Sequence, residues 1–400
     1  MRRGSKVVFG VGGGIAAFKA VETIRLLMER GAEVHAVMSA AAARFITPFS
    51  LENLTNHEVF SDLWAESTEG ETHVRLASWA DVVVVAPATM ELLGKLALGL
   101  PDDALTCTVA ACPAPLVLAP AMNTVMFAQP ALQQNLETLR ARGASIVGPV
   151  SGRLANGASG LGRMAAPEDI AAATAVALGR SDALAGRRIV VTAGPTQEPL
   201  DPVRYIGNRS SGKMGYAVAL GARDRGALVT LISGPVALAE PWGVELVKVG
   251  TAAEMRHAVE RAVGGADVLV MAAAVADYRP RTVAPGKIKK GEATLTLDLE
   301  RTDDILGGLS QAPLLKVGFA AETDHVLDEG LRKLHHKGLD FVVANDVQGG
   351  AVFGHDDNHV HMIAEDGSIT TVGPTSKANV AEAILDAIVD ALLNAGDIEE

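Results

Sequence analysis

Residues 187–220 read RRIVVTAGPTQEPLDPVRYIGNRSSGKMGYAVAL, and they indicate the fold more strongly than any other stretch of the chain. The first eight residues form an apolar run bounded by turn residues, which is typical of a buried strand that ends in a loop. From Met214 onward the apolar residues have helical spacing. Between the two, Ser210, Ser211 and Gly212 should offer free backbone N–H groups at a helix N-terminus, where phosphate and carboxylate groups bind. The stretch therefore predicts a strand-to-helix crossing with a site for an anionic ligand.

The same crossing also resembles a phosphate-binding P-loop. The glycine and lysine spacing from Gly207 to Lys213 matches that motif, but the next residue is Met214, where a P-loop needs a Ser or Thr hydroxyl for Mg²⁺. A P-loop ATPase is therefore not expected. Taken alone, the serines and Lys213 are also compatible with an ordinary helix N-cap beside a solvent-facing lysine.

The length of the chain and its pattern of apolar runs predict two α/β domains. Four hundred residues exceed what one hydrophobic core usually serves. A helical pattern at residues 167–178 is followed by the short polar segment GRSDALAGRR, and a new strand begins at Ile189. We therefore expect one domain at residues 1–180 and a second at residues 187–400.

Within each half, apolar runs alternate with helical patterns, as in a parallel sheet that is covered by helices on both faces. Both domains are therefore expected to be doubly wound. The expected strands lie at residues 6–11, 32–39, 81–89, 114–122 and 144–150 in the first half, and at 188–194, 227–234, 266–277 and 339–346 in the second. The second half should close with a hairpin, in which Asp366-Gly367 is the turn, and with an amphipathic helix.

Composition argues against several classes of protein. A net charge of −12 argues against a nucleic-acid surface, which needs clustered Lys and Arg. Cys107 and Cys112 have no further Cys or His at metal-ligand spacing, so we expect core thiols in a reducing cytoplasm. No apolar segment is long enough to span a membrane without a charge, Gly or Pro. The apolar start of the chain is better explained by a first strand than by a signal peptide.

Three glycines at residues 12–14 follow the first expected strand and open a helix, so that backbone N–H groups can face a phosphate there. Their spacing passes as a loose dinucleotide fingerprint. However, the second strand ends at Ser39, without the acidic residue that an NAD site needs for the ribose. A mononucleotide with a terminal phosphate, such as FMN, fits this pattern better.

The first half, through Met164, resembles the flavin-dependent cysteine decarboxylase family. Members of that family carry a GG-I-A-A-x-K start, a catalytic His and a PxMN loop, and residues 13–19 (GGIAAFK), His73 and residues 120–123 (PAMN) match these. The resemblance implies a flavodoxin-like flavoprotein in which His73 assists oxidation of the substrate's cysteine thiol and Asn123 holds the carboxylate that leaves as CO₂. The positions that it implies for FMN binding are Gly12, Gly13, Ile15, Ser39, Thr89 and Ala121. Taken alone, His73 is more typical of a surface histidine.

The loop that clamps the substrate in this family differs here at a catalytic position. Where the family that makes phosphopantetheine usually reads L-A-C-G-D, residues 154–158 read LANGA, so Asn156 replaces the cysteine that is expected to donate a proton in the last step. An amide donates far less readily than a thiol because its N–H is much less acidic. Two alternatives stay open. Either another group completes the reduction to 4'-phosphopantetheine, or this half stops at the enethiol or serves as a flavin-bound assembly scaffold.

The second half resembles phosphopantothenate-cysteine ligase through the signature GPTQEPLDPVRYIGNRSSGKMG at residues 194–215. Further matches are VADYR at residues 275–279, KIKK at 287–290 and GFAAET at 318–323. The resemblance implies a Rossmann-like ligase domain that joins 4'-phosphopantothenate to cysteine with CTP and Mg²⁺. It also implies that Asn208 stabilises the acyl-cytidylate intermediate.

The same resemblance implies a set of nucleotide contacts. The implied CTP-binding positions are Ser210, Ser211, Gly212, Lys213, Ala272, Ala273, Asp277, Lys287, Asp304, Ile305, Phe319, Lys333 and Lys337, and Asp277 is also the expected Mg²⁺ ligand. Taken alone, Asp277 could equally cap a turn. Residues alone do not separate CTP from ATP. The family also implies a homo-oligomer of trimeric flavin domains and dimeric ligase domains. The alternative to an enzyme is a flavin-binding protein with a regulatory or scaffold function.

Overall fold

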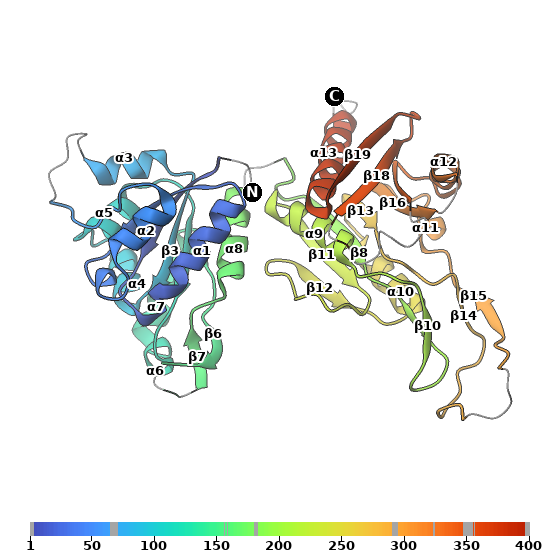
Figure 1. The fold of residues 1–400 in the computed structure, drawn as a ribbon, viewed down its shortest axis with the longest axis horizontal. Coiled ribbons are helices and arrows are strands. Elements are labelled where there is room, and N and C mark those ends of the chain that lie inside the picture. The colour runs from blue at the N-terminus through green and yellow to red at the C-terminus, as the bar shows by residue number, and fades with distance from the viewer. Residues whose placement is uncertain are drawn as a thin grey trace. The chain divides into compact units, whose positions relative to one another are not determined.

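The structure, a computed structural model, describes residues 4–64, 71–155, 157, 159–179, 183–289, 295–322, 325–346, 355 and 357–396. Contacts between Cα atoms divide the chain into two compact units, Met1–Asp182 and Ala183–Glu400. Each unit contains a mainly parallel sheet with helices against both faces (Figure 1). The expectation of an α/β chain with two doubly wound sheets is confirmed.

The first unit contains a five-stranded parallel sheet in the order β2-β1-β3-β4-β5. Its strands are β1 (Lys6–Val11), β2 (Glu33–Met38), β3 (Val82–Ala88), β4 (Leu116–Pro120) and β5 (Ser145–Ile146). All seven residues of β3 are buried, as expected for a central strand that is covered on both faces. This strand order is that of flavodoxin, in which the order reverses between β1 and β3 and leaves a crevice at their carboxyl ends.

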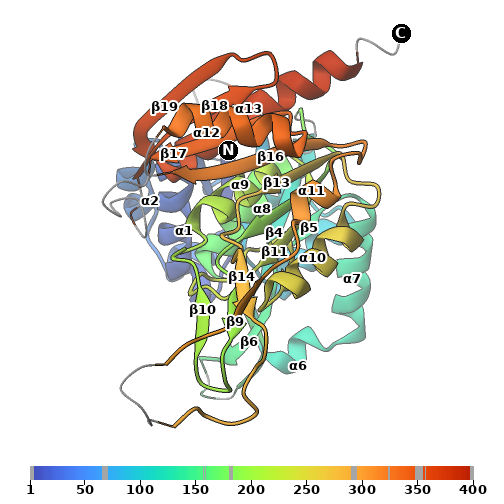
Figure 2. The same ribbon diagram turned by 90° about the vertical axis from the view of Figure 1, so that its right-hand side faces the viewer.

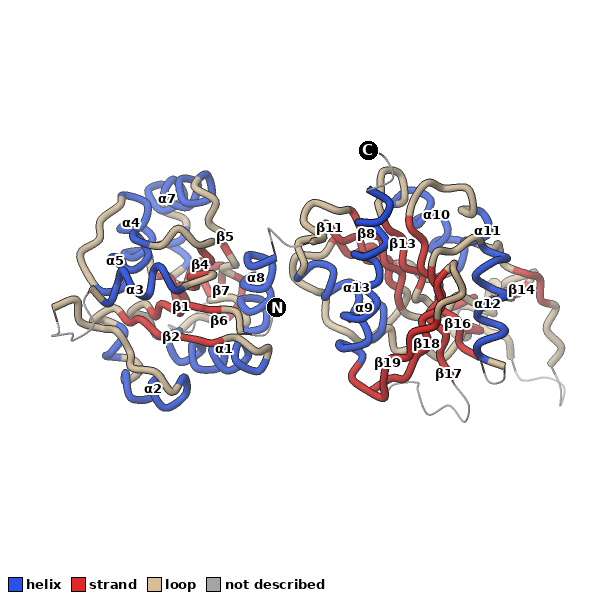
Figure 3. The backbone as a smooth tube through the Cα atoms, turned by 90° about the horizontal axis from the view of Figure 1, so that it is seen from above, coloured by secondary structure: helices blue, strands red, loops and turns tan. Residues whose placement is uncertain are grey.

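Helices cover both faces of this sheet (Figure 3). On one side lie α1 (Phe18–Glu29), α2 (Pro48–Thr55) and α8 (Pro167–Gly179), and on the other α3 (Thr72–Trp79), α4 (Met90–Leu98), α5 (Ala104–Ala111) and α7 (Pro130–Ala141). Three short helices, η1 (Ile15–Ala17), η2 (Ala42–Arg44) and α6 (Thr124–Phe127), and the antiparallel hairpin of β6 (Val150–Arg153) and β7 (Ser159–Arg163) lie in the connections. The hairpin and α6 are close enough that a Cβ on Gly160 would lie 2.5 Å from Oγ1 of Thr124.

The second unit contains an eight-stranded sheet in the order β12-β11-β8-β13-β16-β17-β18-β19. Its parallel strands are β8 (Arg188–Ala193), β11 (Leu228–Ser233), β12 (Glu245–Lys248), β13 (Val268–Met271), β16 (Leu315–Glu322) and β17 (Phe341–Asp346). Numbered along the chain, these six have the Rossmann order 3-2-1-4-5-6. The antiparallel hairpin of β18 (Asp357–Ala364) and β19 (Ile369–Ser376) completes the sheet, with Gly367 in its turn at φ +81°. The predicted hairpin with its Asp366-Gly367 turn is therefore confirmed.

The helices of the second unit also form two groups (Figure 3). One face carries α9 (Lys213–Asp224) and α13 (Lys377–Gly396), and the other α10 (Ala252–Ala262), α11 (Ile305–Gly308) and α12 (Val326–Lys337). The helices α9 and α13 pack so closely that a Cβ on Gly221 would lie 2.7 Å from Cδ1 of Leu385. Two small antiparallel pairs, β9 (Gln197–Pro199) with β10 (Tyr205–Gly207) and β14 (Tyr278–Pro280) with β15 (Leu299–Arg301), extend beyond the main sheet (Figure 2).

Two expectations from the sequence concern the state of the cysteines and membrane-spanning segments. Cys107 and Cys112 are free thiols, as predicted, but both are partly exposed rather than buried in the core. Burial of part of each side chain raises the pKa of both thiols. A search of the described helices finds none that combines the length and the apolar composition needed to cross a bilayer.

Candidate active sites

The first unit contains a cavity of about 860 Å³ at the carboxyl ends of its strands. Its walls come from the turn after β1, the start of α4, the loop after β4 and the β6–β7 hairpin. Four of the positions predicted for FMN line it, namely Gly13, Ile15, Thr89 and Ala121, and so does Asn123. The cavity lies where the strand order reverses, which is the usual ligand position in open α/β sheets.

Close packing against neighbouring loops requires glycine at the two positions that follow β1. A Cβ on Gly12 would lie 2.3 Å from the carbonyl oxygen of Pro87, and one on Gly13 would lie 2.3 Å from Cβ of Ala41. No side chain fits at either position. The turn therefore presents backbone to the cavity, as a phosphate-binding turn must.

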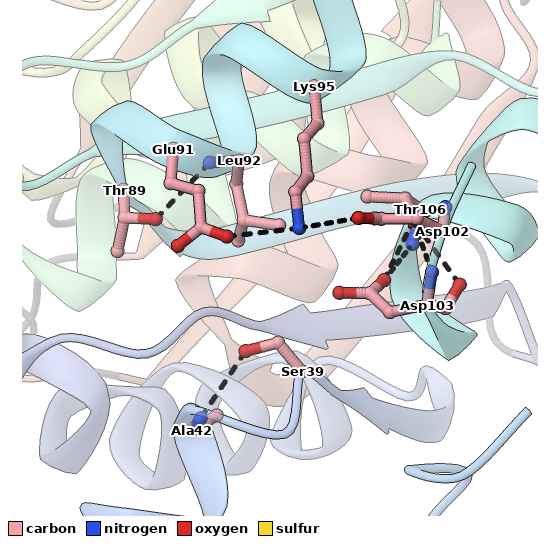
Figure 4. Close-up of polar contacts among 9 residues, drawn as sticks. All are labelled: Ser39, Ala42, Thr89, Glu91, Leu92, Lys95, Asp102, Asp103 and Thr106. Atoms are coloured by element: carbon pink, nitrogen blue, oxygen red, sulfur yellow. Dashed lines mark hydrogen bonds and ion pairs between the residues drawn. The ribbon is translucent and has the colours of Figure 1, made fainter. Parts of the chain in front are cut away.

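Two hydroxyl groups near this turn accept backbone N–H groups, and that of Thr89 caps α4 (Figure 4). Oγ1 of Thr89 accepts the N–H of Leu92 at 3.3 Å, and Oγ of Ser39 accepts the N–H of Ala42 at 3.3 Å. Since each oxygen acts as an acceptor in these bonds, each hydroxyl proton remains available to an anionic acceptor. Ser39 is buried and is not among the residues that line the cavity, so the structure does not place it where the predicted contact with FMN would form.

Three cationic side chains also line the cavity, and the sequence assigned none of them a role, although Lys19 is the last residue of the matched GGIAAFK start. They are Lys19, Arg153 and Arg163. Nζ of Lys19 donates to the carbonyl oxygen of Met164 at 3.2 Å, and burial together with the nearby charge of Arg163 lowers the pKa of Lys19. The donors in this cavity suit a ligand with phosphate and other anionic groups, so the residues present fit FMN.

The three predicted catalytic positions of this half differ in their placement. Asn123 lies at the cavity, and its Oδ1 accepts the N–H of Val125 at 2.8 Å, so that it caps α6 and keeps its amide N–H groups as donors. His73 lies half-buried on α3 and is not among the lining residues. Asn156 lies outside the described residues.

The second unit contains a cavity of about 640 Å³ beside the carboxyl ends of β13 and β16. Seven predicted nucleotide contacts line it: Ala273, Asp277, Asp304, Ile305, Phe319, Lys333 and Lys337. They come from segments between residues 273 and 337, and the parallel pairing of β13 with β16 brings those segments to one edge of the sheet. Arg301 and His336 line the same cavity, and sequence reasoning missed both, since their only signal was a position close to predicted contacts.

The lysines on α12 are held by contacts within the unit. Nζ of Lys333 donates to the carbonyl oxygen of Phe319 at 2.6 Å, and Lys337 forms an ion pair with Asp304. Oδ1 of Asp304 also accepts the N–H of Gly307 at 3.0 Å and so caps α11. Burial alone would raise the pKa of Asp304, but the Lys337 ammonium, the N–H of Gly307 and the nearby His336 together outweigh it, and the pKa of that carboxyl lies below its ordinary value. Two ammonium groups are thereby placed at one end of the cavity.

The SSGKMG crossing adjoins this cavity through Asn208. The side-chain nitrogen of Asn208 donates to the carbonyl oxygen of Val275, a lining residue, at 2.9 Å. Gly212 has φ +74° and precedes the first residue of α9. The prediction that its N–H is free is wrong: that N–H donates to Oγ of Ser210 at 3.3 Å, because the hydroxyl caps the turn from within.

Several predicted nucleotide contacts do not line the second cavity. They are Ser210, Ser211, Gly212, Lys213, Ala272 and Lys287. Ala272 follows β13 and is half-buried, whereas Lys287 is exposed on the loop between β14 and β15. The predicted contacts on α11, β16 and α12 therefore line the cavity. The SSGKMG crossing and the loop that carries Lys287 do not.

A possible metal site was predicted only at Asp277, whose exposed carboxylate lines the second cavity together with Asp303 and Asp304. In the part of the chain that the structure describes, one group of three His, Cys, Asp or Glu side chains has its ligand atoms within 4.8 Å of one another: Glu33, His35 and His57. The two imidazole rings stack, with centroids 3.9 Å apart and planes at 19°. Their nitrogen lone pairs therefore lie in two nearly parallel planes, which is unfavourable for tetrahedral coordination of one ion.

Family models match both units. The model for the flavoprotein family matches residues 1–179, and the model for the DNA/pantothenate metabolism flavoprotein C-terminal domain matches residues 184–392.

Similar proteins cover nearly the whole chain. The coenzyme A biosynthesis bifunctional protein CoaBC of Mycobacterium tuberculosis is 46% identical over 402 residues, which cover 96% of each chain. The proteins of the same name from Escherichia coli and Bacillus subtilis are 44% and 42% identical, and cover 96% and 97% of this chain and 97% of their own. Among solved structures, the C-terminal domain of a CoaBC protein has 42% identity and a TM-score of 0.47, and covers 54% of this chain and 100% of that one. The FMN-dependent cysteine decarboxylase SpaF has 36% identity and a TM-score of 0.36, and covers 40% of this chain and 89% of its own.

Proposed function

Because the chain belongs to the CoaBC family of coenzyme A biosynthesis bifunctional proteins, we propose that its two units divide the two reactions of that family between them. The chain is an enzyme of coenzyme A biosynthesis, both a phosphopantothenoylcysteine decarboxylase and a phosphopantothenate-cysteine ligase. The decarboxylase is assigned to residues 1–180 and the ligase to residues 187–400. We place both reactions in the cytoplasm, in line with the two free cysteines.

The ligase assignment rests on the cavity that collects Asp277, Phe319, Lys333 and Lys337 at one sheet edge. The proposed substrates are CTP, 4'-phosphopantothenate and cysteine. Lys333 and Lys337, with Lys287 from the neighbouring loop, bind the triphosphate and spread its charge while the pantothenate carboxylate attacks the α-phosphate. The carboxylate of Asp277 faces this cavity and would hold Mg²⁺, an ion for which carboxylate oxygens are suitable ligands.

Asn208 is proposed to act in the second half of the ligase reaction. When the amine of cysteine attacks the acyl-cytidylate, negative charge develops on the acyl oxygen. A side-chain amide donor at that position lowers the energy of this step. The bond from Asn208 to Val275 supports the proposal because it holds the amide against the lining of the nucleotide cavity.

The decarboxylase assignment rests on the donor-rich cavity at the switch point of the first sheet. Bound FMN would supply the two-electron oxidation of the substrate's cysteine thiol. The backbone of the turn at Gly12 and Gly13 and the hydroxyl of Thr89 are proposed to bind its phosphate. The amide of Asn123 is proposed to hold the substrate carboxylate before it departs.

The reaction of this half, in which Asn156 replaces the expected proton donor, has a direct test. Full-length enzyme loaded with FMN would be incubated with 4'-phosphopantothenoylcysteine, and the product would be identified by mass. Release of CO₂ with formation of 4'-phosphopantetheine supports the complete reaction. Accumulation of the enethiol would support the second candidate, an active ligase joined to a flavoprotein that stops before reduction, which the residue Asn156 favours. In that case Asn156→Cys should restore reduction.

We further propose a homo-oligomer with trimeric flavin units and dimeric ligase units. Large apolar side chains of the first unit are exposed, among them Phe18 at 65% and Phe49 at 71%. Exposed apolar groups of this size support self-association. Light scattering on the full chain and on the separate halves tests each assembly, and a monomeric full chain would contradict both.

The decisive test of the ligase is pyrophosphate release from CTP that depends on 4'-phosphopantothenate. Replacing CTP by ATP measures nucleotide choice. A protein that binds FMN but releases no pyrophosphate under these conditions would be a flavin-binding scaffold instead.

A further inference from the structure

The loop that carries Lys287 is fastened to the turn before β10 by a buried carboxylate. Asp201 is 2% exposed. Its Oδ1 accepts the N–H groups of Val203 and Arg204, both at 2.8 Å, and its Oδ2 accepts the N–H of Ile288 at 3.1 Å. Asp201 lies within the signature at residues 194–215, and the sequence analysis assigned it no role. Three backbone donors thus satisfy a carboxylate that is removed from solvent.

Only one of these three bonds reaches outside the turn. The bonds from Val203 and Arg204 close a local turn, whereas Ile288 lies 87 residues further along the chain. Arg204 adds to this link, because its Nε lies 3.3 Å from Oδ2 of Asp201 and its guanidinium donates to the carbonyl oxygen of Ile288. Both backbone groups of Ile288 are therefore bound to the turn. A second link joins the N–H of Ala284 to the carbonyl oxygen of Leu200 at 3.0 Å.

The two segments that this carboxylate joins carry the two proposed ligase groups. Lys287 directly precedes Ile288 in the loop, and Asn208 directly follows β10, the strand that the turn leads into. Figure 2 shows β9, β10 and β14 side by side below the main sheet. Burial would raise the pKa of Asp201, but the N–H of Ile288 and those of the turn outweigh it and hold the pKa below its ordinary value. The carboxylate is therefore charged at neutral pH.

We propose that Asp201 is a positioning residue of the ligase: by binding the backbone of Ile288, it holds Lys287 beside the nucleotide cavity, in register with the hairpin that leads to Asn208. The inference rests on the proposed roles of Lys287 and Asn208. Asp201 acts without touching substrate. A lysine whose backbone is already fixed loses less freedom when it binds a phosphate, so nucleotide activation gains from this link.

The substitution Asp201→Asn distinguishes a role in positioning the Lys287 loop from a role in stabilising the local turn. Asparagine keeps Oδ1, which can still accept the two N–H groups inside the turn, as Asn commonly does. Its second group becomes an NH₂, which faces the N–H of Ile288 and the guanidinium of Arg204, so the bond from Ile288 to this side chain is lost. Ile288→Pro breaks the same bond from the loop side, because proline has no N–H. Asp298→Asn is the matched control, since Asp298 pairs with Arg281 on the same loop at 3.1 Å but both side chains are exposed.

The first measurement is trypsin cleavage of the full chain after Lys287, which does not depend on activity. Asp201→Asn should speed this cleavage about tenfold, the effect of losing one hydrogen bond to a charged group, at an unchanged melting temperature. Asp298→Asn should leave the rate unchanged. Ile288→Pro creates a Lys-Pro bond that trypsin does not cleave, so this variant is measured by pyrophosphate release alone, where it should behave like Asp201→Asn. Equal cleavage rates in the wild type, Asp201→Asn and Asp298→Asn would overturn the proposal.

The second measurement is pyrophosphate release with CTP and 4'-phosphopantothenate. If Asp201 acts through Lys287, Asp201→Asn lowers kcat/KM for CTP about tenfold, and adding it to Lys287→Gln lowers activity no further. Independent, additive losses would overturn the positioning role. If the wild-type protein releases no pyrophosphate, the proposed function fails, while the cleavage experiment still shows whether Asp201 holds the loop.

Discussion

The side-chain amide of Asn208 donates a hydrogen bond to the backbone carbonyl oxygen of Val275 at 2.9 Å. This bond joins the end of the β9–β10 hairpin to the lining of the nucleotide cavity, across 67 residues of sequence. It orients the amide, and the proposed ligase reaction needs that amide as a donor to the acyl oxygen.

Replacing this amide should slow amide-bond formation but not nucleotide activation. In Asn208→Asp the donor is lost and a carboxylate faces the oxygen of Val275, so we expect the second half-reaction to slow about 100-fold to 1,000-fold. Rapid-quench measurement of both half-reactions checks this. Asn379→Asp is a control, because the amide of Asn379, on α13, makes an exposed hydrogen bond to the hydroxyl of Thr375 at the end of β19. Unchanged turnover in Asn208→Asp would remove Asn208 from the mechanism.

The ammonium group of Lys337 should contribute to nucleotide binding. Lys337→Gln removes a cation from the cavity and leaves Asp304 without its ion-pair partner, so KM for CTP should rise at least about tenfold. Steady-state kinetics at two salt concentrations test this, because the wild-type KM should depend more steeply on salt. Lys248→Gln is a suitable control, since Lys248 and its partner Glu240 are both exposed. The assignment of Lys337 fails if both variants behave alike.

The turn after β1 should not tolerate a single added methyl group. In Gly13→Ala the new Cβ would lie 2.3 Å from Cβ of Ala41, so the turn must move and the cavity must lose its backbone wall. We expect loss of FMN from the purified protein, measured by absorbance. In Gly94→Ala, on α4, the nearest atom lies 3.6 Å from the new Cβ, and helix propensity should stabilise the unit by about 0.5–1 kcal/mol. Full retention of FMN by Gly13→Ala would contradict this account.

The stability of the first unit should fall as the pH drops below about 6.5, the ordinary pKa of histidine. Burial lowers the pKa of His35, and the neighbouring His57 lowers it further. The unfolded chain therefore binds more protons than the folded chain below that pH, and stability is lost on acidification. Glu33 opposes the shift and Arg75 adds to it.

The substitution His35→Phe tests this effect because it keeps a ring against His57 and Trp79 but cannot be protonated. The melting temperature of the variant should change less between pH 7.5 and pH 5.5 than that of the wild type. His257→Phe, on the exposed side of α10, controls for the loss of an imidazole. Parallel curves for His35→Phe and the wild type would contradict the assignment.

Much of the fold could be read from local pattern. The central strands β3 and β8 are apolar runs, and the Asp366-Gly367 turn is specific enough to place the last hairpin. The strand β12 was missed because it is a four-residue edge strand, ELVK, that carries no apolar run. A short strand at the edge of a sheet is defined by its pairing with a neighbour rather than by its own residues.

The sequence by itself determined the two doubly wound units, the family and the residue types of both sites, because buried strands, glycine turns and motif residues are local properties of the chain. Only the tertiary structure decided which of those residues meet. It brought Lys337 to Asp304, Asn208 to Val275 and Ile288 to Asp201, and it left His73 away from the described cavity lining. The physical reason is that these contacts depend on strand order and on where buried polar groups find partners, and neither is encoded in the spacing of residues along one segment.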